Sequence, residues 1–218
     1  HGLILPLAWP RRRQEARRPG ADGLPTGPGH NRPVATDQIT VQAAGRQVRL
    51  TSPGKVLFPE QGWTKLNVAR HYLMCAPGVV RGVHRRPCSL KRWPQGVDHP
   101  PFFTKRAPAT IREAVAVRFP SARPGRMALV DDVSDIVDQV QLGCIDLNPW
   151  TSRDRDLDHP DELRLDLDPT EGFGFDECRA VAAGCRDLLE EQGLVGWPKT
   201  SGSRGLHIYV RLHPRWTF

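Results

Sequence analysis

The chain has 218 residues, enough for one large domain or two small ones with a sizeable buried core. A hydrophobic fraction of 39% and a charged fraction of 25% are typical of a globular protein in water. No apolar stretch is long enough to span a membrane, so no membrane partner is expected. The five cysteines are scattered, odd in number and without a Cys-x-x-Cys pair, which disfavours zinc and a disulfide framework and favours a cytoplasmic location.

The net charge of +7 is unevenly distributed along the chain. Residues 55–106 hold ten Lys and Arg against two acids, whereas residues 131–191 hold eighteen acids against five Arg. A basic half next to an acidic half indicates a phosphate-binding surface beside a cation site. Ordinary solvated charge is the alternative. It fits residues 154–161 well, but it fits Lys91 and Arg92 poorly, because these two close an apolar run.

Residues 1–36 are rich in Pro, Gly and Arg without periodicity, so a disordered tail is expected there. Further along, Thr64 is a suitable N-cap for a helix that runs to residue 74, and Gly193 a suitable C′ residue for a helix over 175–192. Another helix is expected over 133–142. Short strands are expected at residues 48–50, 88–92, 102–105, 115–119, 127–130, 144–147, 161–167, 195–200 and 206–212. This order favours an α/β or α+β domain with a mixed sheet and flanking helices.

Asp166 and Asp168 are two residues apart in an expected strand, so their side chains share one face. The alternating leucines of the same segment then point into a core: Leu163, Leu165 and Leu167. Two carboxylates at a strand end are a suitable seat for Mg²⁺ or Mn²⁺, which would neutralise phosphate charge and activate an attacking hydroxyl. A capping or solvent-facing role is the alternative, because Asp-x-Asp is frequent by chance.

A turn rich in Gly and Ser precedes the last expected strand. Gly202 and Gly205 allow the backbone to approach an anion closely, Ser201 offers a hydroxyl, and Arg204 can bind phosphate bidentately. His207 follows on the polar face of the strand. A lone histidine is more often structural, but next to this turn and the carboxylate pair a contact to a triphosphate is favoured. A metal seat beside a phosphate-binding turn predicts nucleotidyl transfer.

Two further groups combine cations with apolar residues. Phe102 and Phe103 precede the cations of residues 105–106, a combination typical of a base-stacking surface beside a phosphate. Because neighbours in a strand face opposite ways, we expect one phenylalanine in the core and the other available for stacking. Lys55 and Lys65 flank an apolar segment, and each alone would be interpreted as a surface lysine.

Together these segments resemble the primase-polymerase domain of bacterial ligase D, of the archaeo-eukaryotic primase superfamily, and especially its stand-alone actinobacterial relatives. The resemblance extends over residues 48–218, and its matching segments, in family order, are 52–59, 64–65, 86–94, 102–108, 166–169 and 199–207. It implies a primase-polymerase fold and the addition of ribo- or deoxynucleotides at DNA gaps or ends in break repair, with Mn²⁺ or Mg²⁺. The implied partners are DNA with a 5′-phosphate, NTP or dNTP, an ATP-dependent DNA ligase and a DNA-end-binding protein. The implied location is nucleoid-associated.

The resemblance also assigns roles by position. It makes Asp166 and Asp168 the metal ligands and catalytic residues. The expected triphosphate contacts are Lys91, Ser201, Arg204 and His207. The expected contacts to the 5′-phosphate across a gap are Lys55 and Lys65, and those stacking on the template are Phe102 and Phe103.

Three departures from the family pattern matter. Asn148 stands before Pro-Trp where ligase D members usually have a histidine, so a nucleotide contact there is expected from an amide that cannot titrate. Arg204 replaces the commoner lysine and keeps the charge. The family continues beyond the equivalent of Phe218 and carries its third metal carboxylate there, so residues 37–218 are expected to be a primase-polymerase domain lacking its C-terminal part.

The absent third carboxylate keeps a second function open, that of a non-catalytic module binding DNA ends and 5′-phosphates. An unrelated Asp-x-Asp enzyme acting on nucleotide sugars is a third hypothesis.

Overall fold

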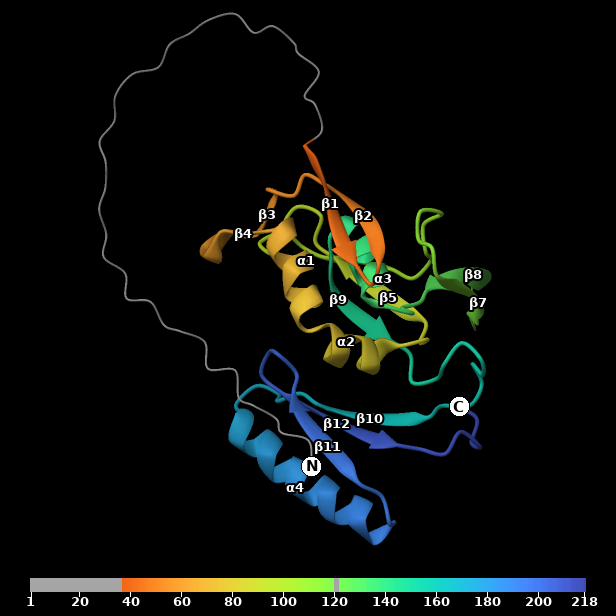
Figure 1. Cartoon of the computed structure of the whole chain (residues 1–218). Helices are drawn as coiled ribbons and strands as arrows, with labels where there is room; N and C mark the ends of the chain where they lie inside the picture. The colour runs from red at the N-terminus through yellow and green to blue at the C-terminus, as the bar shows by residue number, and fades with distance from the viewer. Residues whose placement is uncertain (1–36, 120–121) are drawn as a thin grey trace, which may run out of the picture. The chain divides into compact units, whose positions relative to one another are not determined.

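The computed structural model describes residues 37–119 and 122–218 (Figure 1), so the predicted tail at 1–36 lies outside the described residues. The helices are α1 (Lys65–Met74), α2 (Ala76–Val83), α3 (Val133–Gln141) and α4 (Phe175–Glu191), with a short 3-10 turn, η1 (Pro59–Gln61). The strands are β1 (Gln38–Ala43), β2 (Arg46–Thr51), β3 (Val56–Phe58), β4 (Trp63–Thr64), β5 (Cys88–Arg92), β6 (Phe102–Thr104), β7 (Ala114–Phe119), β8 (Ala122–Ala128), β9 (Cys144–Pro149), β10 (Glu162–Leu167), β11 (Gly196–Thr200) and β12 (Leu206–Arg211).

The first unit is the β1–β2 hairpin, packed on α1 and α3. Ala44 and Gly45 both have positive φ, at 48° and 76°, as a two-residue type I′ hairpin turn requires. The alternate residues of the hairpin are buried against the two helices: Val41, Ala43, Val48 and Leu50. α1 starts at the predicted N-cap, where Thr64 Oγ1 accepts from the Asn67 amide and Asn67 Oδ1 accepts from the Thr64 amide.

The second unit is a sheet centred on β5. This strand pairs antiparallel with β6, β8 and β9, and β7 completes the sheet by pairing with β8. Cys88 and Leu90 point into a core shared with α2 and α3, while Ser89 and Lys91 take the opposite face. That opposite face is the one that carries predicted site residues.

The third unit is an antiparallel sheet of order β10-β12-β11, covered by α4 on one face. Leu165 and Leu167, as predicted, form the apolar face beneath α4 together with Ile208 and Val210 of β12. Leu163 is the exception, because it is 37% exposed near the start of β10 and does not join this core. The polar residues of β10 and β12 take the opposite face.

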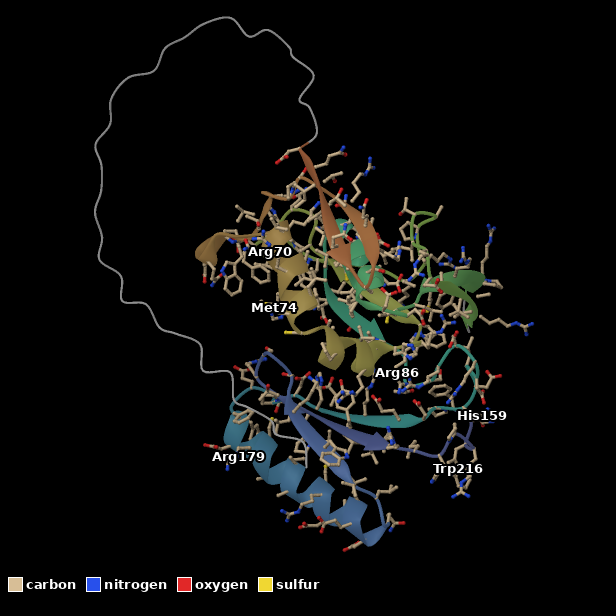
Figure 2. All side chains as sticks on the ribbon, viewed as in Figure 1. Arg70, Met74, Arg86, His159, Arg179 and Trp216 are labelled. Carbon is tan, nitrogen blue, oxygen red and sulfur yellow. The ribbon has the colours of Figure 1, made fainter. Side chains whose placement is uncertain are left out.

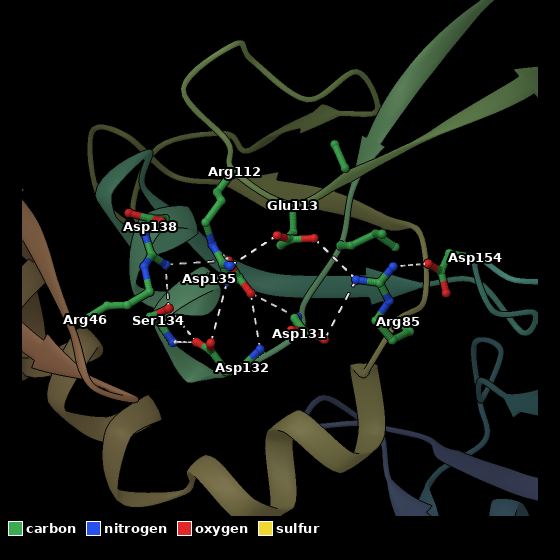
Figure 3. Close-up of polar contacts among 12 residues, drawn as sticks. Arg46, Arg85, Arg112, Glu113, Asp131, Asp132, Ser134, Asp135, Asp138 and Asp154 are labelled. Carbon is green, nitrogen blue, oxygen red and sulfur yellow. Dashed lines mark hydrogen bonds and ion pairs between the residues drawn. The ribbon is translucent and has the colours of Figure 1, made fainter.

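A network of arginines and carboxylates fixes the start of α3 to its neighbours (Figure 3). Asp132 caps the helix, and the buried Asp135 accepts from the amides of both Asp131 and Asp132. Arg112 Nη2 reaches Asp135 Oδ1 at 2.7 Å, and Arg46 of β2 donates to the hydroxyl of Ser134 at 2.6 Å. The hairpin, the loop before β7 and α3 are therefore joined by charge-assisted bonds.

Every strand pair between described residues is antiparallel, so the predicted α/β class takes its α+β form, with helices flanking the sheets. In the part of the chain that the structure describes, we find no helix with the length and apolar character needed to cross a membrane.

Candidate active site

Asp166 and His207 face each other across the β10–β12 pair. The two residues are directly opposed in the antiparallel register, and His207 Nε2 lies 3.3 Å from Asp166 Oδ1. The side chain of Asp166 is 65% exposed, whereas that of His207 is 29% exposed. His207 therefore orients the carboxylate from the sheet, while most of the carboxylate stays accessible to a cation or a ligand.

Asp168 follows β10 directly and is also exposed. Gly205, at the start of β12, packs against this strand end. A β-carbon on Gly205 would lie 2.2 Å from the Leu167 carbonyl oxygen and 2.9 Å from Asp168 Oδ1, so only glycine fits. Gly205 thus allows a close backbone approach to the end of β10, which brings the Gly/Ser turn against the carboxylate pair. The approach of this turn to an anion stays a prediction.

The Gly/Ser turn is closed by the side chain of Ser201. Its hydroxyl oxygen accepts from the amides of Ser203 at 3.2 Å and Gly205 at 3.1 Å, and the Ser201 amide donates to the Gly205 carbonyl at 3.0 Å. Gly202 has a φ of +90°, and a β-carbon there would meet no atom within 4 Å, so its role is conformational. Arg204 is exposed and its side chain bonds to no other described residue, so its guanidinium can bind an anion.

Lys91 lies on the exposed face of the β5 sheet. It is paired with Asp146 of β9 and with Phe103 of β6 in the strand registers. Its ammonium lies 5.1 Å from the Trp93 ring centroid and 5.8 Å from that of Phe103. Within the described residues it has no ion-pair partner, so two aromatic rings hold a cation that can still bind phosphate.

Asn148 shares this face, because it is opposed to Ser89 in the β5–β9 register. Its Nδ2 atom is buried and has no hydrogen-bond partner among the described residues. A buried, unpaired donor is costly, and a ligand oxygen would satisfy it. The carbonyls of the next two residues, Pro149 and Trp150, accept hydrogen bonds from Arg164 of β10, which connects the Asn148 strand to the strand of Asp166.

Lys55 and Lys65 are brought together, but in different surroundings. The Lys65 amide donates to the Lys55 carbonyl at 2.8 Å, and Lys55 is exposed. Lys65 is only 7% exposed, and its ammonium donates to the carbonyls of Thr51 at 2.8 Å and Gln141 at 3.4 Å. Burial lowers the pKa of Lys65, and the charge of Lys55 lowers it further. Lys55 is therefore available to an anion, whereas the Lys65 ammonium is already bonded to backbone.

Phe102 and Phe103 are both exposed, at 46% and 54%. The expectation that one of them is in the core is therefore wrong. The reason is that β6 is a three-residue strand at the edge of its sheet, paired only with β5, so neither face is covered. Arg92 stacks on Phe102 at 4.9 Å, while Phe103 lies with Lys91 on the site face.

Comparison with known proteins connects this geometry to one family. A sequence model described as "LigD, primase-polymerase domain" matches residues 64–218. The chain belongs to this family. The multifunctional non-homologous end joining DNA repair protein LigD of Mycobacterium tuberculosis is 34% identical over 188 residues, which cover 78% of this chain and 24% of LigD. The corresponding protein of Pseudomonas aeruginosa is 31% identical over 176 residues, covering 80% of this chain and 21% of that protein.

A solved structure agrees with this assignment. The polymerase domain from Mycobacterium tuberculosis ligase D in complex with DNA superposes with a TM-score of 0.66 and 32% identity, covering 76% of this chain and 61% of that chain. The predicted family and its fold are thus confirmed. The chain spans about a quarter of the length of the curated LigD proteins.

In this LigD-type domain, the sequence interpretation missed the residues that join the two sheets of the site. Arg86 is 3% exposed, lies between α2 and β10 (Figure 2), and reaches Asp161 at 2.6 Å and Glu162 at 3.1 Å. Arg153 also binds Asp161, at 2.7 Å.

Burial alone would raise the pKa of Asp161, but bonds from Arg153 and Arg86 hold that pKa below its ordinary value. Asp161 is therefore not the solvated charge expected from the sequence; the doublet Arg85-Arg86 before a buried strand was the available signal.

The carboxylate pair suits the metal that the family implies. Asp166 and Asp168 are exposed carboxylates at one strand end, which suits a hard cation that keeps water or phosphate oxygens as its other ligands. Among the described residues, no three His, Cys, Asp or Glu side chains gather as a complete metal site. Because Asp166 and Asp168 are both exposed at the end of β10, these two carboxylates fit a divalent cation.

Proposed function

We propose that this chain is a nucleotidyltransferase of DNA break repair, which adds nucleotides at gaps or broken ends. The observation that carries the proposal is the packing of the Gly/Ser turn against the carboxylate pair, through the contact of Gly205 with Leu167 and Asp168. This contact places anion-binding groups beside cation-binding groups, as phosphoryl transfer requires. Membership of the LigD primase-polymerase family supports the same reaction.

The proposed roles follow from the accessible groups. Asp166 and Asp168 would hold Mn²⁺ or Mg²⁺, which supplies neutralisation of phosphate charge and activation of the attacking hydroxyl. Arg204 and Lys91 are cations that bond to no carboxylate among the described residues, so they can bind the triphosphate. His207 orients Asp166, and the unpaired Nδ2 of Asn148 can donate to the nucleotide.

Primer extension on gapped DNA with Mn²⁺, carried out with both NTP and dNTP, tests this function. We expect the chain to extend the primer and Asp166→Asn to abolish extension. Asp187→Asn is the matched control, because that carboxylate is 61% exposed and also paired with a cation, Arg186, but lies on α4. If Asp166→Asn extends primers as fast as Asp187→Asn, the carboxylate pair is not catalytic.

Recognition of the gap is the second part of the proposal. Lys55 is exposed next to Lys65 and can bind the 5′-phosphate on the far side of a gap, while the exposed rings of Phe102 and Phe103 can stack on template bases. We expect the wild-type chain to prefer a gap with a 5′-phosphate over one with a 5′-hydroxyl. An ATP-dependent ligase would then seal the product, with a DNA-end-binding protein as a further partner, in keeping with the end-joining names of the relatives.

A second candidate function is supported by one observation, the absence of a three-ligand metal cluster in the described part of the chain. It is a non-catalytic module that binds DNA ends through the 5′-phosphate. Binding to a 5′-phosphorylated gap without incorporation of any nucleotide would favour this module over the enzyme.

A further inference from the structure

A cleft of about 820 Å³ lies between α2 and the polar face of the β10-β12-β11 sheet. Arg81 and Gly82 of α2 line one side of it. Trp197 of β11 and Tyr209 and Arg211 of β12 line the other. α2 lies on the side of this sheet away from α4 (Figure 1), so the cleft opens on the face that carries the candidate active site.

The cleft continues the candidate active site along β12. His207, Tyr209 and Arg211 alternate on one face of this strand, with Tyr209 opposed to Arg164 on β10 and Trp197 on β11. At about 3.3 Å per residue, Arg211 lies on the order of 13 Å from His207. A long ligand that binds in the cleft and follows β12 would therefore reach the Asp166–His207 pair.

The available charge in the cleft is positive. Its two carboxylates are neutralised, since Asp161 binds Arg86 and Arg153, and Glu162 binds Arg86 and Arg164. Arg81 and Arg211 are exposed, and their side chains make no hydrogen bond or ion pair with any other described residue. Two cations without partners facing one cleft fit an anionic ligand.

A second hollow, of about 640 Å³, adjoins the cleft at Arg211, which lines both. Its two acidic residues are both paired, Asp154 with Arg85 and Asp161 with Arg86 and Arg153. Arg155 also lines this hollow and is exposed, again with no side-chain partner among residues 37–119 and 122–218. The unpaired cations are thus spread along two adjoining hollows, which fits the repeated phosphates of a strand better than the single triphosphate of one nucleotide.

The cleft also offers aromatic surface. Trp197 is 64% exposed on the edge strand β11. Tyr209 lies beside it in the register, with the Arg164 guanidinium 5.2 Å and the Lys199 ammonium 5.8 Å from its ring. An exposed indole between unpaired arginines is the combination by which single-stranded nucleic acid is bound, with bases on rings and phosphates on cations.

We propose that this cleft binds a single DNA strand and directs it toward Asp166. Arg81 and Arg211 contact its phosphates, and Trp197 stacks on a base. The proposal rests on the proposed function for the direction of the strand, but binding itself can be measured without catalysis.

The experiment is equilibrium binding of a short fluorescent oligothymidylate to the full chain, in EDTA and without nucleotide, over a series of salt concentrations. Trp197→Ala is expected to weaken binding by roughly five- to a hundredfold. Arg211→Gln is expected to reduce the slope of log affinity against log salt by about 0.7, the value for one phosphate contact on a single strand. Matched controls are Trp216→Ala, where the indole is 65% exposed, and Arg70→Gln on α1; neither residue lines the cleft.

Thermal unfolding verifies that each variant is folded. Wild-type affinity and salt slope in both Trp197→Ala and Arg211→Gln would overturn the proposal, as would equal losses in the two controls. Primer extension separates this proposal from the proposed function. If the wild-type chain extends primers and Trp197→Ala changes neither binding nor extension, the cleft proposal fails alone. If the wild-type chain extends nothing but Trp197→Ala abolishes binding, the cleft stands and the catalytic proposal fails.

Discussion

Gly205 and Leu167 approach so closely that a β-carbon on Gly205 would lie 2.2 Å from the Leu167 carbonyl oxygen. Because the obstructing atom is backbone, Gly205→Ala must displace the end of β10, which positions Asp166 and Asp168. We expect a loss of about 1–3 kcal/mol in the free energy of unfolding. Nucleotide incorporation should fall by more than the stability loss explains. Urea unfolding and primer extension measure the two effects.

Gly184→Ala is the control for this substitution. Gly184 lies within α4, and no atom is within 4 Å of its β-carbon position. Alanine is favoured over glycine in a helix, so this variant should gain up to about 1 kcal/mol and keep full activity. Wild-type stability in Gly205→Ala would show that the turn does not pack on the strand end as described.

Substitution by methionine is expected to lower stability at Lys65 and to change gap recognition at Lys55. Lys65→Met removes the ammonium that bonds the carbonyls of Thr51 and Gln141, so we expect a loss of about 1–3 kcal/mol in the free energy of unfolding. Lys55→Met changes an exposed residue and should leave stability within about 0.5 kcal/mol. It should instead abolish the preference for a 5′-phosphorylated gap.

The two measurements are urea unfolding and extension on gaps with and without the 5′-phosphate. Each variant serves as the control for the other, because the two lysines are neighbours with the same charge. A stable Lys65→Met variant that loses only the phosphate preference would show that the Lys65 ammonium leaves its two carbonyls to bind DNA.

Local signals in the sequence were sufficient for most elements. Thr64 caps α1, Gly193 adopts a positive φ after α4, and Leu165 and Leu167 point into the core of the third sheet, all as predicted. α2 was not predicted, since its sequence contains Pro77 and Gly78, which disfavour a helix, and packing of Val83 against the β5 core outweighs them. The strand predicted at 127–130 starts instead at Ala122, where Arg, Pro and Gly hide the alternation.

The site was predictable where its residues are close in sequence or strand register, as for Asp166 and His207. It was not predictable where the surroundings come from distant segments. The buried ammonium of Lys65 donates its hydrogen bonds to carbonyls of residues 51 and 141, and Arg86 forms its ion pairs with residues 161–162. No local pattern encodes these contacts, because each is formed only when separate elements pack together.

Asp161 should make stability depend on acid pH. Its pKa is held below the ordinary value near 4 by bonds from Arg153 and Arg86, which outweigh the effect of burial. The carboxylate therefore contributes stability that is fully present above the unfolded-state pKa and lost as the pH falls through the lowered folded-state pKa. We expect Asp161→Asn to lower stability at neutral pH by about 1–3 kcal/mol and to flatten its decline below pH about 4. Urea unfolding at several pH values measures this.

Asp156→Asn is the control, because Asp156 forms an exposed pair with His159 in the same loop, and surface pairs contribute little. The Asp156→Asn substitution should leave the urea midpoint of unfolding at neutral pH unchanged. If Asp161→Asn also leaves that midpoint unchanged, then Asp161 does not join Arg86 and Arg153 across the two sheets in solution.

Asn148 is expected to show a conflict between stability and function. Its Nδ2 is buried without a partner among the described residues, which costs folding free energy unless a ligand accepts its hydrogen bond. Asn148→Leu should therefore be neutral, or stabilising by up to about 1 kcal/mol, in the absence of nucleotide. The same variant should raise the KM for the incoming nucleotide about tenfold, the effect of losing one hydrogen bond to a charged group.

Ser152→Ala separates this prediction from a general effect of buried polar atoms. Ser152 is fully buried and its hydroxyl, like Asn148 Nδ2, has no partner within the described residues. Removing that hydroxyl should also be neutral or stabilising, but it should leave the KM unchanged, because Ser152 is outside the strand face that carries Lys91. Equal KM values in both variants would mean that the unpaired amide of Asn148 does not face the nucleotide. A KM that rises in Asn148→Leu but not in Ser152→Ala would identify the Asn148 amide as a hydrogen-bond donor to the nucleotide.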